Sequence, residues 1–291
     1  MLRILLTGAS GYLGSHLAHA FLNSGHEVAI LKRSTSCMNR IADITNQIIT
    51  FDVDIDTVRA PFENLGHIDA IVHTATCYGR NNENPVDIFK TNTLFPLELL
   101  EAAAFFKTKT FFNTDTVLHE HLNAYALSKK QFRLWGKNYA DSGKIKFVNI
   151  RLEHFFGPGD DSSKFTTWVI QQCLANVPSI PLTMGEQKRD FIYIDDVVSA
   201  YLLLLEKIDT ENEWLDIRLN TGHPLTIKEF VKAVHEATHS TSKLDFGALP
   251  YRKNEIRQST KNPYFIEESG WRIKWDLASG LRESIRKEFN K

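Results

Sequence analysis

The sequence predicts an α/β fold with a doubly wound parallel sheet and a second, smaller α/β lobe. In its first half, short apolar runs alternate with longer amphipathic stretches. Alternation of this kind is typical of parallel strands joined by crossover helices that cover both faces of the sheet. A glycine-rich segment follows the first apolar run directly, and beyond residue 155 the pattern loosens. These observations indicate one large nucleotide-binding-type domain followed by a smaller lobe.

Short apolar runs predict the strands, and longer amphipathic stretches predict the helices between them. The expected strands are residues 2–6, 27–31, 48–52, 69–73, 109–113 and 146–151. The expected helices are residues 12–24, 86–105 and 122–141. The connections 36–45 and 55–65 are weakly patterned, so only short helices are expected there.

The remainder of the chain predicts a loop at 157–165, a helix at 164–176 and two helices at 226–238 and 276–289. The apolar segment DFIYI and the helix 195–207 are expected to rejoin the main sheet. The expected domains are therefore 1–160 with 190–222 for the cofactor, and 161–189 with 223–291 for the substrate.

Composition excludes several functions. The 34 basic and 35 acidic residues nearly cancel, so charge gives no reason to expect nucleic acid as a partner. The three cysteines are widely spaced without a CxxC, which argues against disulfides or zinc and favours a reducing cytoplasm. The apolar N-terminal run is too short to cross a membrane. The histidines at 73, 119, 121 and 154 show no cluster with carboxylates, so no metal is expected.

The segment TGASGYLG, residues 7–14, follows the first expected strand and opens the first helix. Gly8 permits a tight turn, Gly11 lets the backbone approach a pyrophosphate, and Gly14 lets helix and strand pack closely. The helix N-terminus offers free N–H groups and a partial positive charge to the phosphates. This context predicts a Rossmann domain that binds a dinucleotide.

The end of the second strand indicates which dinucleotide is bound. An NAD enzyme usually has an acid there to hold the ribose hydroxyls, whereas this chain has Lys32, Arg33 and Ser34. A guanidinium and a hydroxyl can bind a 2′-phosphate. NADPH is therefore expected, and NAD is disfavoured. Asp52, at the end of the third strand, is a candidate for the adenine.

Tyr125 and Lys129 are four residues apart on an expected helix, which places both side chains on one face. A nearby ammonium favours the phenolate and is expected to lower the tyrosine pKa, which would make the phenol a proton donor near neutral pH. Thr114 lies at the carboxyl end of the preceding strand, where its hydroxyl is expected to point at a substrate oxygen. Thr116 cannot act as a base, which disfavours elimination of water.

Together these segments resemble the extended short-chain dehydrogenase/reductases, the NAD-dependent epimerase/dehydratase family. TGASGYLG, DAIVHTAT, KTNTLFPLELLEAA, YALSK, RLEHFFGPGD, RDFIYIDDVV and RKNEIRQS follow the family's order over nearly the whole chain. Within the family, the chain is most similar to enzymes that reduce the 4-keto group of CDP-3,6-dideoxyhexoses for O-antigen synthesis. The resemblance implies a homodimer and a CDP- or dTDP-4-keto-deoxyhexose substrate.

The resemblance also implies the site residues. It assigns catalysis to Thr114, Tyr125 and Lys129. It assigns the cofactor to Thr7, Gly8, Ser10, Gly11, Tyr12, Leu13, Gly14, Lys32, Arg33, Ser34, Asp52, Val53, Thr74, Ala75 and Thr76, besides Tyr125 and Lys129. It assigns the substrate to Tyr78, Arg80, Asp115, Glu153, His154, Lys164, Phe165, Arg189, Arg252 and Glu255.

The chain departs from the family at His154, where asparagine is usual, and at Asp115–Thr116, where dehydratases carry Asp-Glu. Other functions stay open. One is a nucleotide-sugar 4-epimerase with tightly bound NAD; another is a reductase of dTDP-4-keto-6-deoxyglucose. A third is a non-catalytic binding protein on a Rossmann scaffold, although such proteins can lose the Tyr/Lys pair that this chain retains.

Overall fold

The computed structural model describes residues 1–208, 213–251 and 270–289. The chain divides into two compact units, Met1–Leu152 with Val198–Ile217 and Glu153–Val197 with Arg218–Lys291. The sequence grouped residues 153–160 with the cofactor domain. In the structure they fall in the second unit, because β7 (His154–Phe156) pairs with β10 (Phe191–Tyr193) of that unit.

The predicted doubly wound sheet is confirmed. Seven strands lie in the order β11-β6-β5-β4-β1-β2-β3, and the successive pairs from β3 to β6 are parallel. Parallel strands bring their carboxyl ends to one edge, where ligands bind in folds of this type. The strands are β1 (Arg3–Thr7), β2 (Glu27–Lys32), β3 (Ile49–Asp52), β4 (Ala70–His73), β5 (Thr110–Thr116), β6 (Lys146–Leu152) and β11 (Trp214–Leu219).

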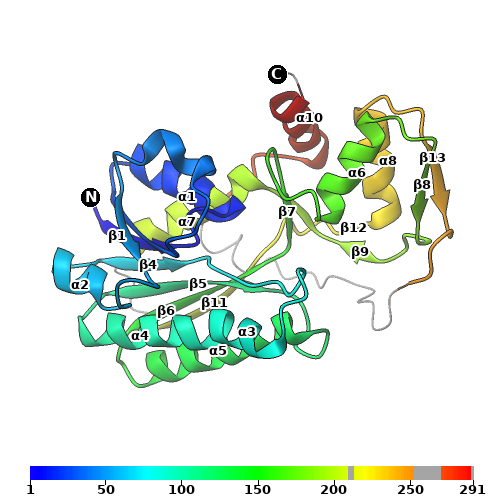
Figure 1. Cartoon of the computed structure of the whole chain (residues 1–291). Coiled ribbons are helices and arrows are strands. Elements are labelled where there is room, and N and C mark those ends of the chain that lie inside the picture. The colour runs from blue at the N-terminus through cyan, green and yellow to red at the C-terminus, as the bar shows by residue number, and fades with distance from the viewer. Residues whose placement is uncertain (209–212, 252–269, 290–291) are drawn as a thin grey trace. The chain divides into compact units, whose positions relative to one another are not determined.

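Helices cover both faces of this sheet. Helices α1 (Tyr12–Asn23) and α7 (Ile194–Glu206) lie on one face, and α4 (Phe95–Phe105) and α5 (Ala124–Asp141) lie on the other (Figure 1). The single helix expected at 86–105 consists of α3 (Pro85–Phe89), a π-helical turn η2 (Lys90–Leu94) and α4. The weakly patterned connections form the short helices η1 (Asn39–Ile44) and α2 (Ala60–Leu65).

Aromatic packing sets the distance between α5 and the sheet. The ring of Phe147 on β6 stacks on Phe111 at 5.4 Å and meets Phe132 of α5 edge-on at 5.7 Å. A Cβ atom at Gly136 would lie 2.2 Å from the Phe147 ring. Only glycine lets α5 approach β6 this closely, and α5 is the helix that carries Tyr125 and Lys129.

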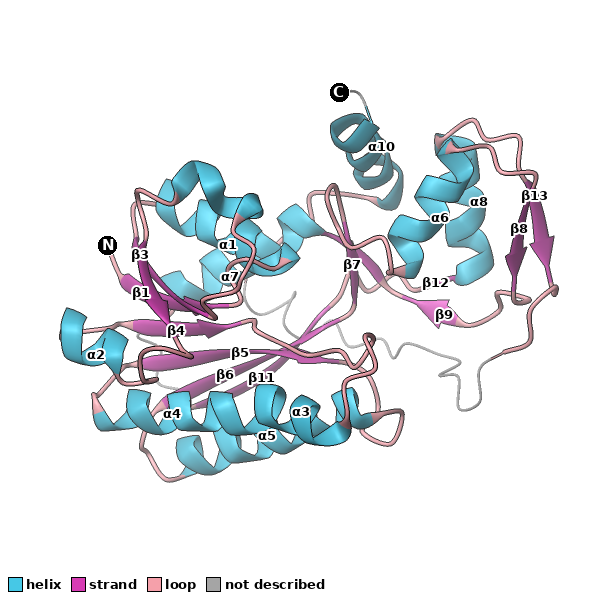
Figure 2. Cartoon of the chain, in the orientation of Figure 1, coloured by secondary structure: helices cyan, strands magenta, loops and turns pink. Residues whose placement is uncertain are grey.

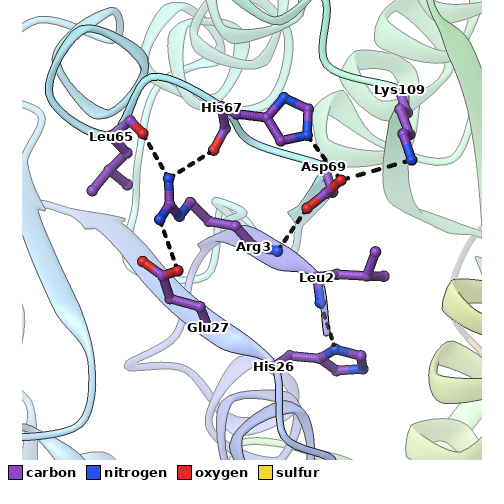
Figure 3. Close-up of polar contacts among 8 residues, drawn as sticks. All are labelled: Leu2, Arg3, His26, Glu27, Leu65, His67, Asp69 and Lys109. Carbon is purple, nitrogen blue, oxygen red and sulfur yellow. Dashed lines mark hydrogen bonds and ion pairs between the residues drawn. The ribbon is translucent and has the colours of Figure 1, made fainter.

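Polar contacts hold the opposite, amino-terminal edge of the sheet (Figure 3). The Arg3 guanidinium donates to the carbonyls of Leu65 at 2.6 Å and His67 at 3.2 Å, and it pairs with Glu27 at 2.9 Å. Asp69 accepts from the Arg3 amide at 2.9 Å and from the His67 ring at 2.9 Å. Because these contacts join β1, β2 and the start of β4, they order the strands that carry the glycine loop.

One predicted strand is wrong. DFIYI does not rejoin the main sheet, because its residues form β10, which pairs in parallel with β7 in a separate two-stranded sheet. The place beside β6 belongs to β11, a strand that the sequence analysis missed. Its sequence WLDIRL mixes apolar and charged residues, as suits an edge strand. Trp214 secures it by stacking on Phe147 at 5.7 Å.

The second unit is built from short strand pairs and helices (Figure 2). Besides the pair β7–β10, β8 and β13 are parallel and β9 and β12 are antiparallel. No helix in the described part of either unit is both long and apolar enough to cross a bilayer. The remaining elements are α6 (Phe165–Leu174), β8 (Ser179–Leu182), β9 (Lys188–Arg189), β12 (Leu225–Thr226), α8 (Ile227–Ala237), β13 (Lys243–Phe246) and α10 (Leu277–Phe289).

Candidate active site

The glycine loop joins β1 to α1 as a tight turn. Gly8 has a φ of +75°, and a Cβ atom there would lie 2.6 Å from the Ala75 amide nitrogen. A Cβ atom at Gly14 would lie 2.1 Å from the Gly8 carbonyl oxygen. Gly11 precedes the helix in an extended conformation, with no side chain to cap the first amides. A helix N-terminus without a side-chain cap, beside a backbone that can be approached closely, fits a pyrophosphate.

Several residues expected at the cofactor have side chains that bind other protein groups. The Thr7 hydroxyl lies 2.8 Å from His73 Nδ1, and the Thr74 hydroxyl donates to the Thr7 carbonyl at 2.7 Å. The Thr76 hydroxyl donates to Asn92 at 3.2 Å. Tyr12 and Leu13 are buried in the first turn of α1, and Ser10 lies in the turn that precedes it.

Asn92 was missed as a site residue by the sequence analysis. It is fully buried in the π-helical turn, accepts from the Cys77 amide at 2.7 Å, and donates to the Cys77 carbonyl at 2.8 Å and to Ser128 of α5 at 3.0 Å. It therefore ties the loop after β4 to the helix that bears Tyr125. No local pattern singled it out, because its neighbours in KTNTLF are themselves mostly polar.

The ends of β2 and β3 place acids beside two of the three residues expected at a 2′-phosphate. Lys32 forms an ion pair with Asp52. The Ser34 hydroxyl donates to Asp54 at 2.6 Å. Asp52 therefore holds Lys32, whereas the sequence analysis expected it at the adenine. Arg33 is exposed, and its guanidinium has no hydrogen bond or ion pair to any residue that the structure describes.

Tyr125 lies in the first turn of α5, which Asn123 caps by accepting from the Ala126 amide at 2.9 Å. Its ring is 5.1 Å from the Tyr78 ring, over which the Arg80 guanidinium lies at 4.6 Å. The Thr116 hydroxyl is close enough to the phenol to act on its pKa. Tyr78 and Arg80, predicted at the substrate, thus gather around the predicted catalytic tyrosine.

The expected direction of the Tyr125 pKa is corrected. Burial raises it well above the ordinary value, and the charges of Tyr78 and Asp115 raise it further, whereas the Thr116 hydrogen bond and Arg80 lower it. A neutral phenol is the form that can donate a proton. Burial lowers the pKa of Lys129 to about 8, against the opposing charge of Asp115. Lys129 is therefore still largely protonated at neutral pH.

Asp115 was expected at the substrate, and the structure corrects this. Its side chain is only 2% exposed, and its carboxylate pairs with Arg133 at 3.3 Å and accepts from Asn149 at 3.0 Å and the Thr116 amide at 2.7 Å. These contacts place it beneath α5. Its charge acts on Tyr125 and Lys129 from inside the protein.

Thr114, expected to point at a substrate oxygen, also contacts a protein group. Its hydroxyl lies 2.7 Å from the phenol oxygen of Tyr201 on α7. Thr116, to which the sequence analysis gave no catalytic role, is the hydroxyl that acts on the pKa of Tyr125. Side chains alternate along a strand, so Thr114 points to the α7 face of the sheet while Asp115 points to the α5 face.

Several residues of the second unit that were expected at the substrate bind other protein groups. Glu153 is buried and forms an ion pair with Arg218, so its carboxylate is committed within the protein. Lys164 pairs with buried Asp160 at 2.9 Å. Phe165 is 37% exposed at the start of α6. The Arg189 guanidinium donates to the Lys188 carbonyl at 2.8 Å, and His154 is half-buried. Arg252 and Glu255 lie outside the described residues.

The histidines do gather with a carboxylate, contrary to expectation. His119, Glu120 and His121 each offer a donor atom, and these atoms lie within 4.8 Å of one another. They are consecutive in the segment between β5 and α5. The sequence analysis missed this group because it did not consider Glu120, which lies between the two histidines.

The model of the NAD dependent epimerase/dehydratase family matches residues 4–217, which span the glycine loop, Tyr125 and Lys129. The chain belongs to this family. CDP-abequose synthase of Salmonella muenchen is 34% identical over 97% of this chain and 97% of that protein. CDP-abequose synthase of Salmonella typhimurium LT2 is 32% identical over 98% and 97%. Family membership supports a nicotinamide dinucleotide as the cofactor.

Solved structures of the family share the fold. UDP-glucose 4-epimerase of Thermotoga maritima superposes with a TM-score of 0.86 at 21% identity, over 98% of both chains. The Thermus thermophilus UDP-glucose 4-epimerase, solved with NAD, gives 0.82 at 24% identity over 98% of both. These similarities support the architecture rather than a substrate.

Proposed function

We propose that this protein is an NADPH-dependent reductase of the 4-keto group of a CDP-activated 3,6-dideoxyhexose, in O-antigen sugar synthesis. The observation that carries the proposal is the end-to-end similarity to two CDP-abequose synthases, at 34% and 32% identity. A UDP-glucose 4-epimerase matches over a comparable length at only 22%. A 4-epimerase with bound NAD and a dTDP-sugar reductase are the alternatives.

The residues around Tyr125 suit reduction of a ketone. When bound, NADPH supplies the hydride to C4. The Tyr125 phenol then donates its proton to the C4 oxygen, so that ketone, hydride and proton become an alcohol. The nearby Thr116 hydroxyl stabilises the negative charge left on the phenol, and the buried Lys129 ammonium adds to that stabilisation. No acid/base side chain stands at position 116, so elimination of water is disfavoured.

We also propose how the units divide the ligands. The first unit holds the cofactor on its glycine loop. The second contributes Arg189, whose guanidinium suits a diphosphate, with His154, Lys164 and Phe165 toward the sugar nucleotide. Arg252 and Glu255 are proposed at the diphosphate and the nucleotide ribose. Free Cys37, Cys77 and Cys173 support a reducing, cytoplasmic location.

The experiment that tests the function is incubation of the protein with NADPH and a panel of CDP- and dTDP-4-keto-deoxyhexoses. We expect NADPH to be consumed in proportion to sugar reduced, with a new C4 alcohol in the NMR spectrum and the highest kcat/KM for a CDP-sugar. Turnover of a 4-hydroxy sugar without net NADPH consumption would favour the epimerase. Better turnover of the dTDP-sugar would move the proposal to that substrate.

Arg33 is proposed as the main determinant of NADPH over NADH, because Lys32 and Ser34 are occupied by Asp52 and Asp54. Arg33→Asp removes a charge-assisted hydrogen bond to the 2′-phosphate and adds repulsion. We expect KM for NADPH to rise about tenfold or more while KM for NADH changes little. Steady-state kinetics with both cofactors measure this. Arg282→Asp, at an exposed arginine of α10, is the matched control, and an equal rise in both KM values would contradict the assignment.

A homodimer is proposed through the helices that carry exposed apolar side chains. Val86, Phe89 and Leu94 on α3 and η2, and Leu127, Leu134 and Trp135 on α5, are 41–59% exposed. The two helical segments pack beside each other, so an apolar face of this kind suits a second copy of the chain.

Trp135→Glu should convert the dimer to a monomer at micromolar concentration, because a buried unpaired carboxylate is costly. Light scattering coupled to gel filtration measures this. Ile55→Glu, at a residue 74% exposed elsewhere on the same unit, should leave the mass unchanged. A dimeric Trp135→Glu protein would place the interface elsewhere.

A further inference from the structure

Tyr201 is a polar side chain in an otherwise apolar stretch of α7, SAYLLLLE. It is fully buried, and its phenol oxygen lies 2.7 Å from the hydroxyl of Thr114 on β5. Thr114 is its hydrogen-bond partner among the residues that the structure describes. A buried phenol needs such a partner, since an unsatisfied hydroxyl in the core is costly.

The geometry of this contact fits either hydroxyl as the donor, and the chemistry of the two groups indicates the direction. Burial raises the pKa of Tyr201, so the phenol keeps its proton at all working pH values. A phenol is a stronger hydrogen-bond donor than an aliphatic alcohol, so Tyr201 donates and Thr114 accepts. The hydrogen of Thr114 is then left to point away from α7. Thr114 is only half-buried, near the carboxyl end of β5, and Thr116, two residues further on, is close enough to Tyr125 to act on its pKa.

We propose that Tyr201 is a positioning residue for the reaction. It holds the Thr114 oxygen from the α7 side, so that Thr114 donates its hydrogen to the oxygen that develops negative charge at C4. Thr114 then contacts the substrate oxygen while the Tyr125 phenol supplies the proton. This inference rests on the proposed reductase function and adds a residue from α7 to it.

Tyr201→Phe is expected to lower kcat about five- to tenfold with KM for the keto sugar unchanged, because one neutral hydrogen bond that acts only in the transition state is lost. Thr114→Val should lower kcat at least as much. In the Thr114→Val background, Tyr201→Phe should have no further effect, whereas with Thr114→Ser, which keeps a hydroxyl, the effect of Tyr201→Phe should persist. A merely structural role of Tyr201 would not produce this coupling between the two substitutions.

Tyr193→Phe is the matched control. Tyr193 is also buried in the core, but its hydroxyl has no hydrogen-bond partner among the described residues, so its removal should leave kcat unchanged. Thermal melts of all variants report their folding. Wild-type turnover with an unchanged kcat in Tyr201→Phe, or additive effects in the cycle, would overturn this inference alone. Absence of wild-type turnover on the whole sugar panel would overturn the proposed function, and the inference with it.

Discussion

Tyr125→Phe is expected to lower kcat by about a hundredfold or more while the fold and cofactor binding survive. The substitution removes the phenol oxygen, and with it the proton that the C4 oxygen must receive. The aromatic ring and its 5.1 Å contact with Tyr78 are kept, so packing should change little. Single-turnover oxidation of NADPH with the keto sugar measures the chemical step directly.

The control for this variant is Tyr139→Phe. Tyr139 lies on the same helix, packs against the core beneath the sheet, and has a pKa that burial also raises. It stands nearly four helical turns from Tyr125, so its hydroxyl should be dispensable for catalysis. Equal loss in both variants would indicate damage to α5 rather than removal of a proton donor. Wild-type turnover in Tyr125→Phe would exclude Tyr125 from the mechanism.

Gly14→Ala is expected to abolish detectable cofactor binding and to lower the melting temperature. The added methyl would lie 2.1 Å from the Gly8 carbonyl oxygen and 2.9 Å from the Ala9 Cα. Both are backbone atoms, so no side chain can rotate away. Helix α1 must then move off the loop, at a cost of roughly 1–3 kcal/mol or more. Its N-terminal amides would no longer meet at the phosphate position.

Titration with NADPH, followed by quenching of protein fluorescence, and thermal melts in the same buffer measure both effects. Gly25→Ala is the control, because Gly25 has a φ of +77° with no atom within 4 Å of the added methyl. It should cost about 1 kcal/mol of stability through backbone strain and leave NADPH affinity intact. NADPH bound by Gly14→Ala with wild-type affinity would show that the loop does not carry the phosphates.

Local pattern predicted much of the fold. The six strands from β1 to β6 and the helices α1, α4 and α5 follow from alternation of short apolar runs with amphipathic stretches, which depends on each segment alone. Local pattern did not predict that β11, rather than DFIYI, joins the main sheet. Both are short and partly apolar, and what decides between them is which one pairs with β6, a contact remote in sequence.

The side chains of the candidate site were likewise predicted only in part. Order along the chain predicted that Tyr125 and Lys129 share a helical face and that Tyr78 and Arg80 come near them. It did not predict that Asp115 turns inward to Arg133 and Asn149, or that Thr114 meets Tyr201. Those outcomes depend on which neighbour each strand face meets, α5 for Asp115 and α7 for Thr114.

The sequence by itself determined the family, the glycine loop and the spacing of the tyrosine and lysine. These are short-range patterns, which can be recognised without knowing any tertiary contact. Only the tertiary structure decided which polar groups are already paired. Lys32, Ser34 and Asp115 are held by protein partners, whereas Arg33 is not held by any described residue. The physical reason is that hydrogen bonds and ion pairs form between groups that folding brings within about 3 Å, wherever they lie along the chain.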